Sequence, residues 1–101
     1  MSIQMILLDL DGTLLTSDKR LSPGNRAALE RAAARGVHIV PSTGRFYSGM
    51  PQVVRELPFV RYVVSINGAL IYDAAEDKVL RRADIAPEDA DRLFQRMEQL
   101  P

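Results

Sequence analysis

Two aspartates stand two positions apart directly after an apolar run near the start of the chain. Asp9 and Asp11 follow the run from Met5 to Leu8, and Gly12 comes immediately after them. In an extended backbone the two side chains would point to opposite faces, so both reach one site only if the chain turns here. Gly12 permits such a turn. Two carboxylates at the end of a strand suit a hard cation such as Mg²⁺, which commonly takes one or two protein carboxylates together with phosphate oxygens.

A cation is also needed on energetic grounds if the substrate is a phosphate. A phosphate dianion about 4 Å from a carboxylate nucleophile is repelled by roughly 4 kcal/mol per charge pair, or roughly 8 kcal/mol in total, at an effective dielectric of about 20. A bridging divalent ion reverses the sign of this interaction. Magnesium is therefore the expected cofactor.

The elements that position these aspartates follow from the hydrophobic pattern. Residues 5–8 form a continuous apolar run, which is typical of a strand buried on both faces of a parallel sheet. Residues 11–21 are turn-forming and predict a loop or short hairpin across the carboxyl end of that strand. A helix is expected over residues 23–35, because Ser22 can cap it, Pro23 suits its first position and Gly36 ends it.

The rest of the chain continues this alternation. We expect a buried strand, a helical stretch and three further strands, at residues 37–40, 47–56, 62–66, 69–72 and 79–82. Asn67-Gly68 predicts a turn. Pro87 begins an amphipathic helix, whose apolar face carries Ala90, Leu93, Phe94, Met97 and Leu100.

Strands that alternate with helices predict an α/β fold built on a partial doubly wound parallel sheet, with a β-hairpin after its first three strands. Sites in such sheets lie at the carboxyl ends of the strands, where Asp9 and Asp11 are placed. The pattern changes from sheet-like to helical near Ala83, which could mark the start of an inserted module.

Three segments resemble one known family. Asp9-Leu-Asp-Gly-Thr-Leu-Leu is similar to the first signature of the haloacid dehalogenase (HAD) superfamily. Val40-Pro-Ser-Thr-Gly-Arg resembles the second signature, in the Thr-Gly-Arg form typical of the Cof-type sugar-phosphate phosphatases, and Ser65-Ile-Asn-Gly-Ala resembles a further segment of that subgroup. The resemblance covers roughly residues 3 to 83.

The resemblance implies a role for each matching residue. Asp9 would attack phosphorus, form an aspartyl phosphate and bind Mg²⁺ through its other oxygen. Asp11 would act as general acid and then general base, and its backbone carbonyl would also bind the metal. Thr43 would hydrogen-bond the phosphoryl group, beside which Gly44 allows close backbone approach. The resemblance also implies that Arg45 and Asn67 lie on the side of the site that faces the substrate. The substrate would be a small phosphorylated metabolite, with sugar phosphates favoured.

The sequence also departs from the family pattern. HAD phosphatases use a lysine that holds the nucleophile and a downstream Gly-Asp segment that completes the metal site. The chain has no Gly-Asp dipeptide, and its two lysines, Lys19 and Lys78, lie in predicted loops away from the expected site. We therefore interpret the chain as an N-terminal fragment of a HAD phosphatase. Residues 1–83 would form part of the HAD-like core, with its Rossmann-like sheet, and residues 84–101 would begin a truncated type IIB cap. Such a fragment is expected to self-associate, bind magnesium weakly and turn over little substrate.

Other classes of protein stay open. A receiver-like domain also accepts phosphate on aspartate, but its acceptor would follow the third strand, where Asn67 and Gly68 stand. A non-catalytic α/β interaction module would use the Asp-Gly and Thr-Gly segments only as turns. Thr43 could simply cap a helix, and Asn67-Gly68 could be an ordinary hairpin turn. Nucleotide binding finds no support, because neither a spaced-glycine fingerprint nor a Gly-Lys-Ser/Thr loop is present.

The amino-acid composition limits the kinds of binding partner that are expected. The 101 residues include 13 basic and 13 acidic side chains, so no net field favours nucleic acid or an anionic membrane. The absence of cysteine excludes disulfides and thiolate metal sites. No apolar run approaches the roughly 20 residues of a membrane helix, and the start of the chain lacks a basic signal-peptide region. A cytoplasmic protein without nucleic-acid or membrane partners is expected.

Overall fold

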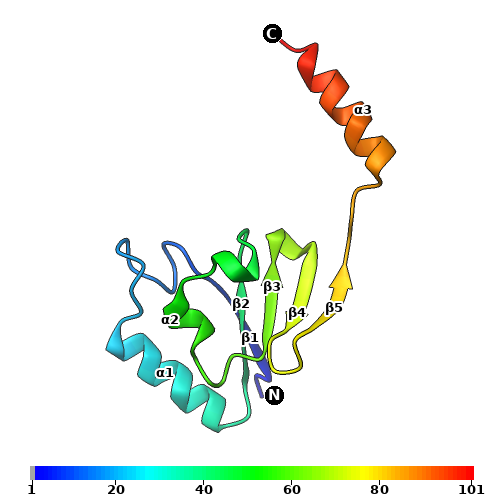
Figure 1. Cartoon of the computed structure of the whole chain (residues 1–101). Coiled ribbons are helices and arrows are strands. Elements are labelled where there is room, and N and C mark those ends of the chain that lie inside the picture. The colour runs from blue at the N-terminus through cyan, green and yellow to red at the C-terminus, as the bar shows by residue number, and fades with distance from the viewer. Residues whose placement is uncertain (1) are drawn as a thin grey trace.

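A five-stranded mixed sheet organises the chain. The computed structural model describes residues 2–101, and the strands lie in the sheet in their order along the chain (Figure 1). The parallel strands are β1 (Met5–Asp9), β2 (His38–Ser42) and β3 (Tyr62–Ser65), and β4 (Leu70–Asp73) and β5 (Lys78–Arg82) continue antiparallel. The predicted α/β fold, with a parallel sheet followed by a hairpin, is confirmed.

Helix α1 (Pro23–Ala34) forms as its sequence predicts. The Ser22 hydroxyl accepts a hydrogen bond from the backbone N–H of Asn25 at 3.1 Å, which satisfies one of the free donors of the first turn. After the helix, Gly36 adopts a φ of +85°, the left-handed conformation that glycine takes most readily. Leu29 is 8% exposed and anchors α1 to the core.

The helix expected over residues 47–56 is interrupted. A short 3₁₀ helix, η1 (Tyr47–Gly49), is followed by the single turn of α2 (Gln52–Arg55). Met50 between them is extended, with φ −71° and ψ 143°, because the ring of Pro51 disfavours the helical region for the residue before it. A second 3₁₀ turn, η2 (Ile66–Gly68), occupies the predicted Asn67-Gly68 turn.

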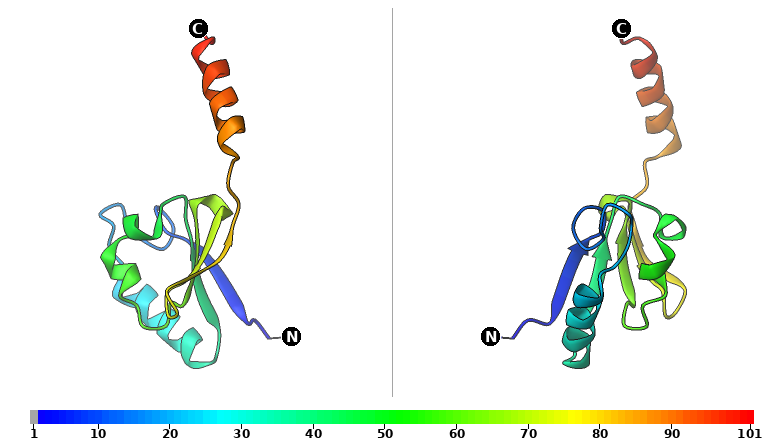
Figure 2. Two further views of the ribbon diagram at one scale, coloured as in Figure 1. Left: turned by 45° about the vertical axis from the view of Figure 1, so that its right-hand side comes forward. Right: turned by 90° about the vertical axis from the view of Figure 1, so that its left-hand side faces the viewer.

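The core lies on one face of the sheet only. Figure 2 shows α1 and α2 together on that face. In β1 the side chains alternate: Ile6 and Leu8 pack against the core, whereas Met5 and Leu7 are 48% and 56% exposed on the other face. The expectation of a strand buried on both faces is therefore wrong for the described residues, because no helix among them covers the second face. The core itself contains Leu10, Leu14, Leu15, Leu29, Ile39, Met50, Val54 and Val63.

Helix α3 (Pro87–Glu98) projects away from the sheet (Figure 1). It gives the molecule a radius of gyration of 16.8 Å, against about 13 Å for a compact domain of 100 residues. The amphipathic helix is confirmed, and the apolar side chains of Leu93, Phe94, Met97 and Leu100 are 53% to 69% exposed. A domain boundary near residue 83, a cap beginning at residue 84 and self-association stay predictions. No helix within residues 2–101 combines the length and the hydropathy that a membrane span requires.

Asp73 at the end of β4 is a buried carboxylate, only 3% exposed, and the structure pairs it fully. It accepts hydrogen bonds from the Arg61 guanidinium, with Nη2 to Oδ2 at 3.1 Å, and from the backbone N–H groups of Ala75 and Glu76. The hydrogen bond from Arg61, aided by the backbone N–H groups, lowers the pKa of Asp73 below its ordinary value despite its burial.

This pairing predicts a specific acid sensitivity. Because the folded pKa lies below the unfolded value of about 3.9, the contribution of Asp73 to stability is complete above that value and is lost as the pH falls through the folded pKa. We expect Asp73→Asn to lower the melting temperature at pH 7 and to flatten the decline of stability below about pH 4. Thermal unfolding followed by circular dichroism at several pH values tests this. An equally steep acid decline in the variant would contradict it.

Candidate active site

The carboxyl ends of the three parallel strands bring the three motif segments to one edge of the sheet. Asp9, the last residue of β1, pairs with Ser42 of β2, and Ser42 pairs with Val64 of β3. The segments that follow β2 and β3, from Thr43 and from Ile66, therefore begin side by side. The prediction that the three segments meet at this edge of the sheet is confirmed, whereas the functional site proposed there stays a prediction.

The chain turns immediately after Asp9. The backbone N–H of Leu14 donates to the Asp9 carbonyl at 3.2 Å, and that of Leu15 donates to the Leu10 carbonyl at 2.9 Å. Gly12 takes the left-handed φ of +75° that closes this turn. The Leu10 side chain is fully buried, while Asp9 and Asp11 on either side of it remain accessible. The predicted turn thus keeps both carboxylates at the surface of the site.

The Asp9 carboxylate is exposed and lightly held. Its Oδ2 accepts a hydrogen bond from the Thr13 hydroxyl at 3.2 Å, within the same turn. No lysine or arginine forms an ion pair with Asp9 among the described residues. An exposed carboxylate with a free oxygen is suited to attack an electrophile that approaches from solvent.

Asp11, in contrast, is held by two cations. Arg45 donates to it through a fork, with Nε to Oδ2 at 2.9 Å and Nη2 to Oδ1 at 3.0 Å. The Lys19 ammonium lies 2.8 Å from Oδ1. The hydrogen bonds from Arg45 and then from Lys19 lower the pKa of Asp11 to about 2. In this arrangement the Asp11 carboxyl group is ionised at neutral pH.

Lys19 lies beside Asp11, although the sequence analysis placed it away from the expected site. The hairpin expected over residues 11–21 forms, with Leu15 bridged to Leu21, and its loop carries Lys19 to Asp11. The sequence contained part of the information needed to predict this contact. A hairpin that crosses the carboxyl end of the first strand must hold its loop, and therefore Lys19, near Asp9 and Asp11. Lys78 begins β5 on the hairpin side of the sheet and stays away from these residues.

The Thr-Gly-Arg and Asn-Gly segments are joined through their backbones. Thr43 is 5% exposed, and its hydroxyl accepts a hydrogen bond from the Arg45 N–H at 3.1 Å. The Asn67 N–H donates to the Thr43 carbonyl at 3.0 Å, and the Ile66 N–H donates to the Arg45 carbonyl at 3.1 Å. Thr43 does not cap η1, whose N-cap is Phe46. The roles of Thr43, Arg45 and Asn67 towards a substrate stay predictions.

Gly44 lies against the side chain of Asn67. A Cβ at this position would meet Asn67 Oδ1 at 3.1 Å, which is tighter than ordinary van der Waals contact. We expect Gly44→Ala to displace the Asn67 side chain and to destabilise the fold by about 1 kcal/mol. In an Asn67→Ala background the same change should cost almost nothing. A double-mutant cycle by urea unfolding measures this coupling, and strictly additive effects would contradict it.

The oxygen donors around Asp9 fit a magnesium ion only in part. The exposed Asp9 carboxylate is a hard donor of the kind that Mg²⁺ takes. Both oxygens of the Asp11 carboxylate are occupied by Arg45 and Lys19, so Asp11 would contribute its main-chain carbonyl instead. Across residues 2–101 no three acidic or histidine side chains come close enough to hold a metal together. Water, phosphate or further protein groups would have to complete the coordination.

Comparison with known proteins identifies the family. Residues 6–101 match the model of the haloacid dehalogenase-like hydrolases. The chain is 39% identical to the phosphatase YwpJ of Bacillus subtilis, over 70% of this chain and 25% of that protein. It is 34% identical to the 5-amino-6-(5-phospho-D-ribitylamino)uracil phosphatase YcsE of the same organism, over 79% of this chain and 32% of that protein. A solved haloacid dehalogenase-like hydrolase from B. subtilis superposes with a TM-score of 0.81 at 33% identity, covering 95% of this chain and 33% of that one.

The chain therefore belongs to the haloacid dehalogenase-like hydrolase family, and the resemblance carried by its three motifs is confirmed. It spans between a quarter and a third of the length of the two curated relatives named above.

Proposed function

We propose that this chain carries the nucleophile half of a magnesium-dependent phosphatase that acts through an aspartyl phosphate on Asp9. The observation that carries the proposal is the turn after β1, which leaves the Asp9 carboxylate exposed beside Asp11 and without an ion pair among residues 2–101. The Thr-Gly-Arg segment lies at the same edge of the sheet. The family match and the phosphatases among the relatives support the same chemistry.

The proposed reaction has two steps: the phosphoryl group moves from the substrate to Asp9, and then from Asp9 to water. In the first, an Asp9 carboxylate oxygen forms a bond to phosphorus while the bond from phosphorus to the leaving alcohol oxygen breaks. Asp11, released from its cations and protonated, gives its proton to that oxygen. In the second transfer, Asp11 takes a proton from a water molecule that attacks phosphorus, and the Asp9 carboxylate is restored with release of inorganic phosphate.

Other groups of the chain would hold the phosphoryl group. The Thr43 hydroxyl stands at the end of β2, where it can donate to a phosphoryl oxygen while still accepting from the Arg45 N–H. A magnesium ion bound by the Asp9 carboxylate and the Asp11 carbonyl would neutralise the repulsion between phosphate and nucleophile. Neither role uses the Asp11 carboxylate, so that group can serve as the proton donor once it is released from its cations.

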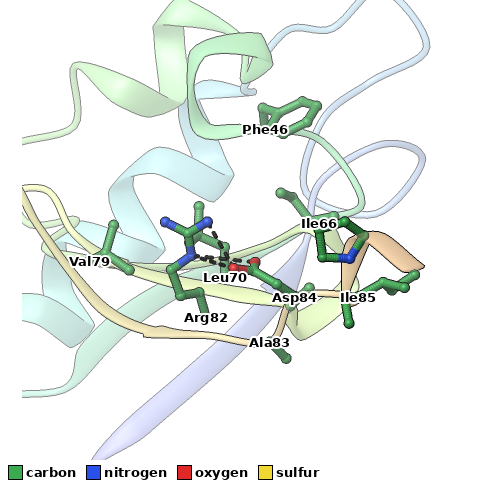
Figure 3. A pocket seen from close by; sticks show the side chains of 11 residues that line it. Phe46, Ile66, Leu70, Val79, Arg82, Ala83, Asp84 and Ile85 are labelled. Carbon is green, nitrogen blue, oxygen red and sulfur yellow. Dashed lines mark hydrogen bonds and ion pairs between the residues drawn. The ribbon is translucent and has the colours of Figure 1, made fainter. Parts of the chain in front are cut away.

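The proposed substrate is a small phosphorylated metabolite. The relatives include the uracil-derivative phosphatase YcsE and the pyridoxal phosphate phosphatase YbhA of Escherichia coli, whose names give small phosphomonoesters as their substrates. A depression of about 950 Å³ opens beside the site and is lined by Phe46, Ile66, Leu70 and the segment around Asp84 (Figure 3). Phe46 follows Arg45 and Ile66 precedes Asn67, which supports the proposal that this depression receives the leaving group.

Capture of the phosphorylated protein tests the proposal without requiring full turnover. We expect incubation with acetyl phosphate and Mg²⁺, followed by acid quenching, to add one phosphoryl group by intact mass. Chelation of the metal with EDTA should prevent the addition, and hydroxylamine should remove it, because acyl phosphates react with amines. A chain that stays unmodified at saturating donor and metal would contradict the proposal.

A further inference from the structure

Two cations converge on one carboxylate at the edge of the proposed active site. Arg45 and Lys19 both contact the Asp11 carboxylate, through three contacts of 2.8 to 3.0 Å. The three groups together carry one excess positive charge. Their side chains are 37% to 48% exposed, so an anion from solvent can reach them. Such a cluster attracts an oxyanion even while its own carboxylate is in place.

Lys19 is held for this contact by a strained loop. Its φ of +60° lies in the left-handed region, which a side chain with a Cβ adopts at a cost that glycine or asparagine largely avoids. The loop is closed by the Lys19 N–H donating to the Thr16 carbonyl at 2.9 Å and the Thr16 N–H donating to the Arg20 carbonyl at 2.8 Å. This strained position brings the Lys19 ammonium to the Asp11 carboxylate.

Arg45 is oriented by a separate contact. Its Nη1 donates to the Gly49 carbonyl at 3.1 Å, which leaves Nε and Nη2 directed at Asp11. This planar fork matches a phosphate as well as it matches a carboxylate. Arg45 therefore does not need to move far for its partner to be exchanged.

We propose that Lys19 and Arg45 form a phosphate-binding subsite, that the Asp11 carboxylate fills this subsite in the free protein, and that the phosphate of the substrate takes its place. This deepens the proposed function and rests on it. The exchange couples substrate binding to the release of the general acid. The phosphate that binds Lys19 and Arg45 also frees the Asp11 carboxyl group to act on the leaving oxygen. Lys19 is thereby a substrate-binding residue from outside the three motif segments.

The test is a titration of the ¹⁵N-labelled 101-residue chain with inorganic phosphate in metal-free buffer. Saturable shifts are expected at the backbone amides of Lys19 and Arg45 and at the Arg45 Nε. Lys19→Met should weaken phosphate binding about tenfold, and Lys19→Arg should largely retain it. Lys78→Met, which removes the chain's other lysine, should bind as the wild type does. Asp11→Asn should tighten binding about tenfold, because it removes the internal competitor.

The Asp11→Asn result separates exchange from a structural role for Lys19. A lysine that only shapes the loop would not make phosphate binding tighter when Asp11 is neutralised. The inference is overturned if the wild type shows no saturable shift at these residues, if Lys19→Met binds as tightly as Lys78→Met, or if Asp11→Asn fails to tighten binding. The titration involves no turnover, so its failure beside successful phosphoprotein capture would reject the subsite and leave the proposed function standing. The reverse pair of results would reject the proposed function.

Discussion

Asp9→Asn is expected to reduce phosphoprotein formation from acetyl phosphate by at least about 10³-fold, because an amide oxygen is a far weaker nucleophile than a carboxylate. The fold should be unaffected, since Asp9 is exposed and, within residues 2–101, its carboxylate accepts a side-chain hydrogen bond only from the Thr13 hydroxyl. Intact mass after timed acid quenching measures the rate in the two proteins.

Asp18→Asn is the matched control for this change. Asp18 is an exposed aspartate in the loop of the adjacent hairpin, one residue before Lys19. The same loss of charge at that position should leave the rate within about twofold, because a surface substitution usually has small effects. Equal labelling of the Asp9 and Asp18 variants would show that Asp9 is not the acceptor.

Leu10→Ala is expected to cost about 2 to 5 kcal/mol of unfolding free energy, a large part of the roughly 5 to 15 kcal/mol that holds a domain together. Leu10 is fully buried in the core and is the link between Asp9 and Asp11. Its side chain therefore fixes the turn that presents both carboxylates. Urea unfolding followed by circular dichroism measures the loss, and phosphoprotein formation should fall together with stability.

Leu7→Ala provides the control within the same strand. Leu7 is 56% exposed on the open face of the sheet, so truncation there removes little buried surface and should cost less than about 1 kcal/mol. If the two leucine variants lost similar stability, the assignment of the core to a single face of the sheet would be wrong.

The sequence was most informative where a local signal had one structural outcome. The apolar run before Asp9 and the following Gly12 predicted a strand that ends in a turn, and the structure has β1 and a left-handed glycine there. Ser22 and Pro23 predicted the start of α1. Because parallel strands end at a common edge, the three motif segments were also placed together correctly.

Features that depend on distant parts of the chain were missed. The apolar run of β1 is compatible with a strand whose sheet is covered by helices on one face or on both. Only the arrangement of α1 and α2 decides between these two possibilities. The helical pattern over residues 47–56 outweighed Pro51, which in fact separates η1 from α2. Lys19 reaches Asp11 through the fold of a loop whose conformation no periodicity encodes.

Locating the phosphoryl group on the chain tests the central proposal most directly. After labelling with acetyl phosphate and Mg²⁺, borohydride reduces an aspartyl phosphate to homoserine, which peptide sequencing by mass spectrometry places at one residue. The proposed function predicts homoserine at position 9 and nowhere else. A label that resists hydroxylamine and maps to a serine or threonine, or a homoserine at another aspartate, would contradict it.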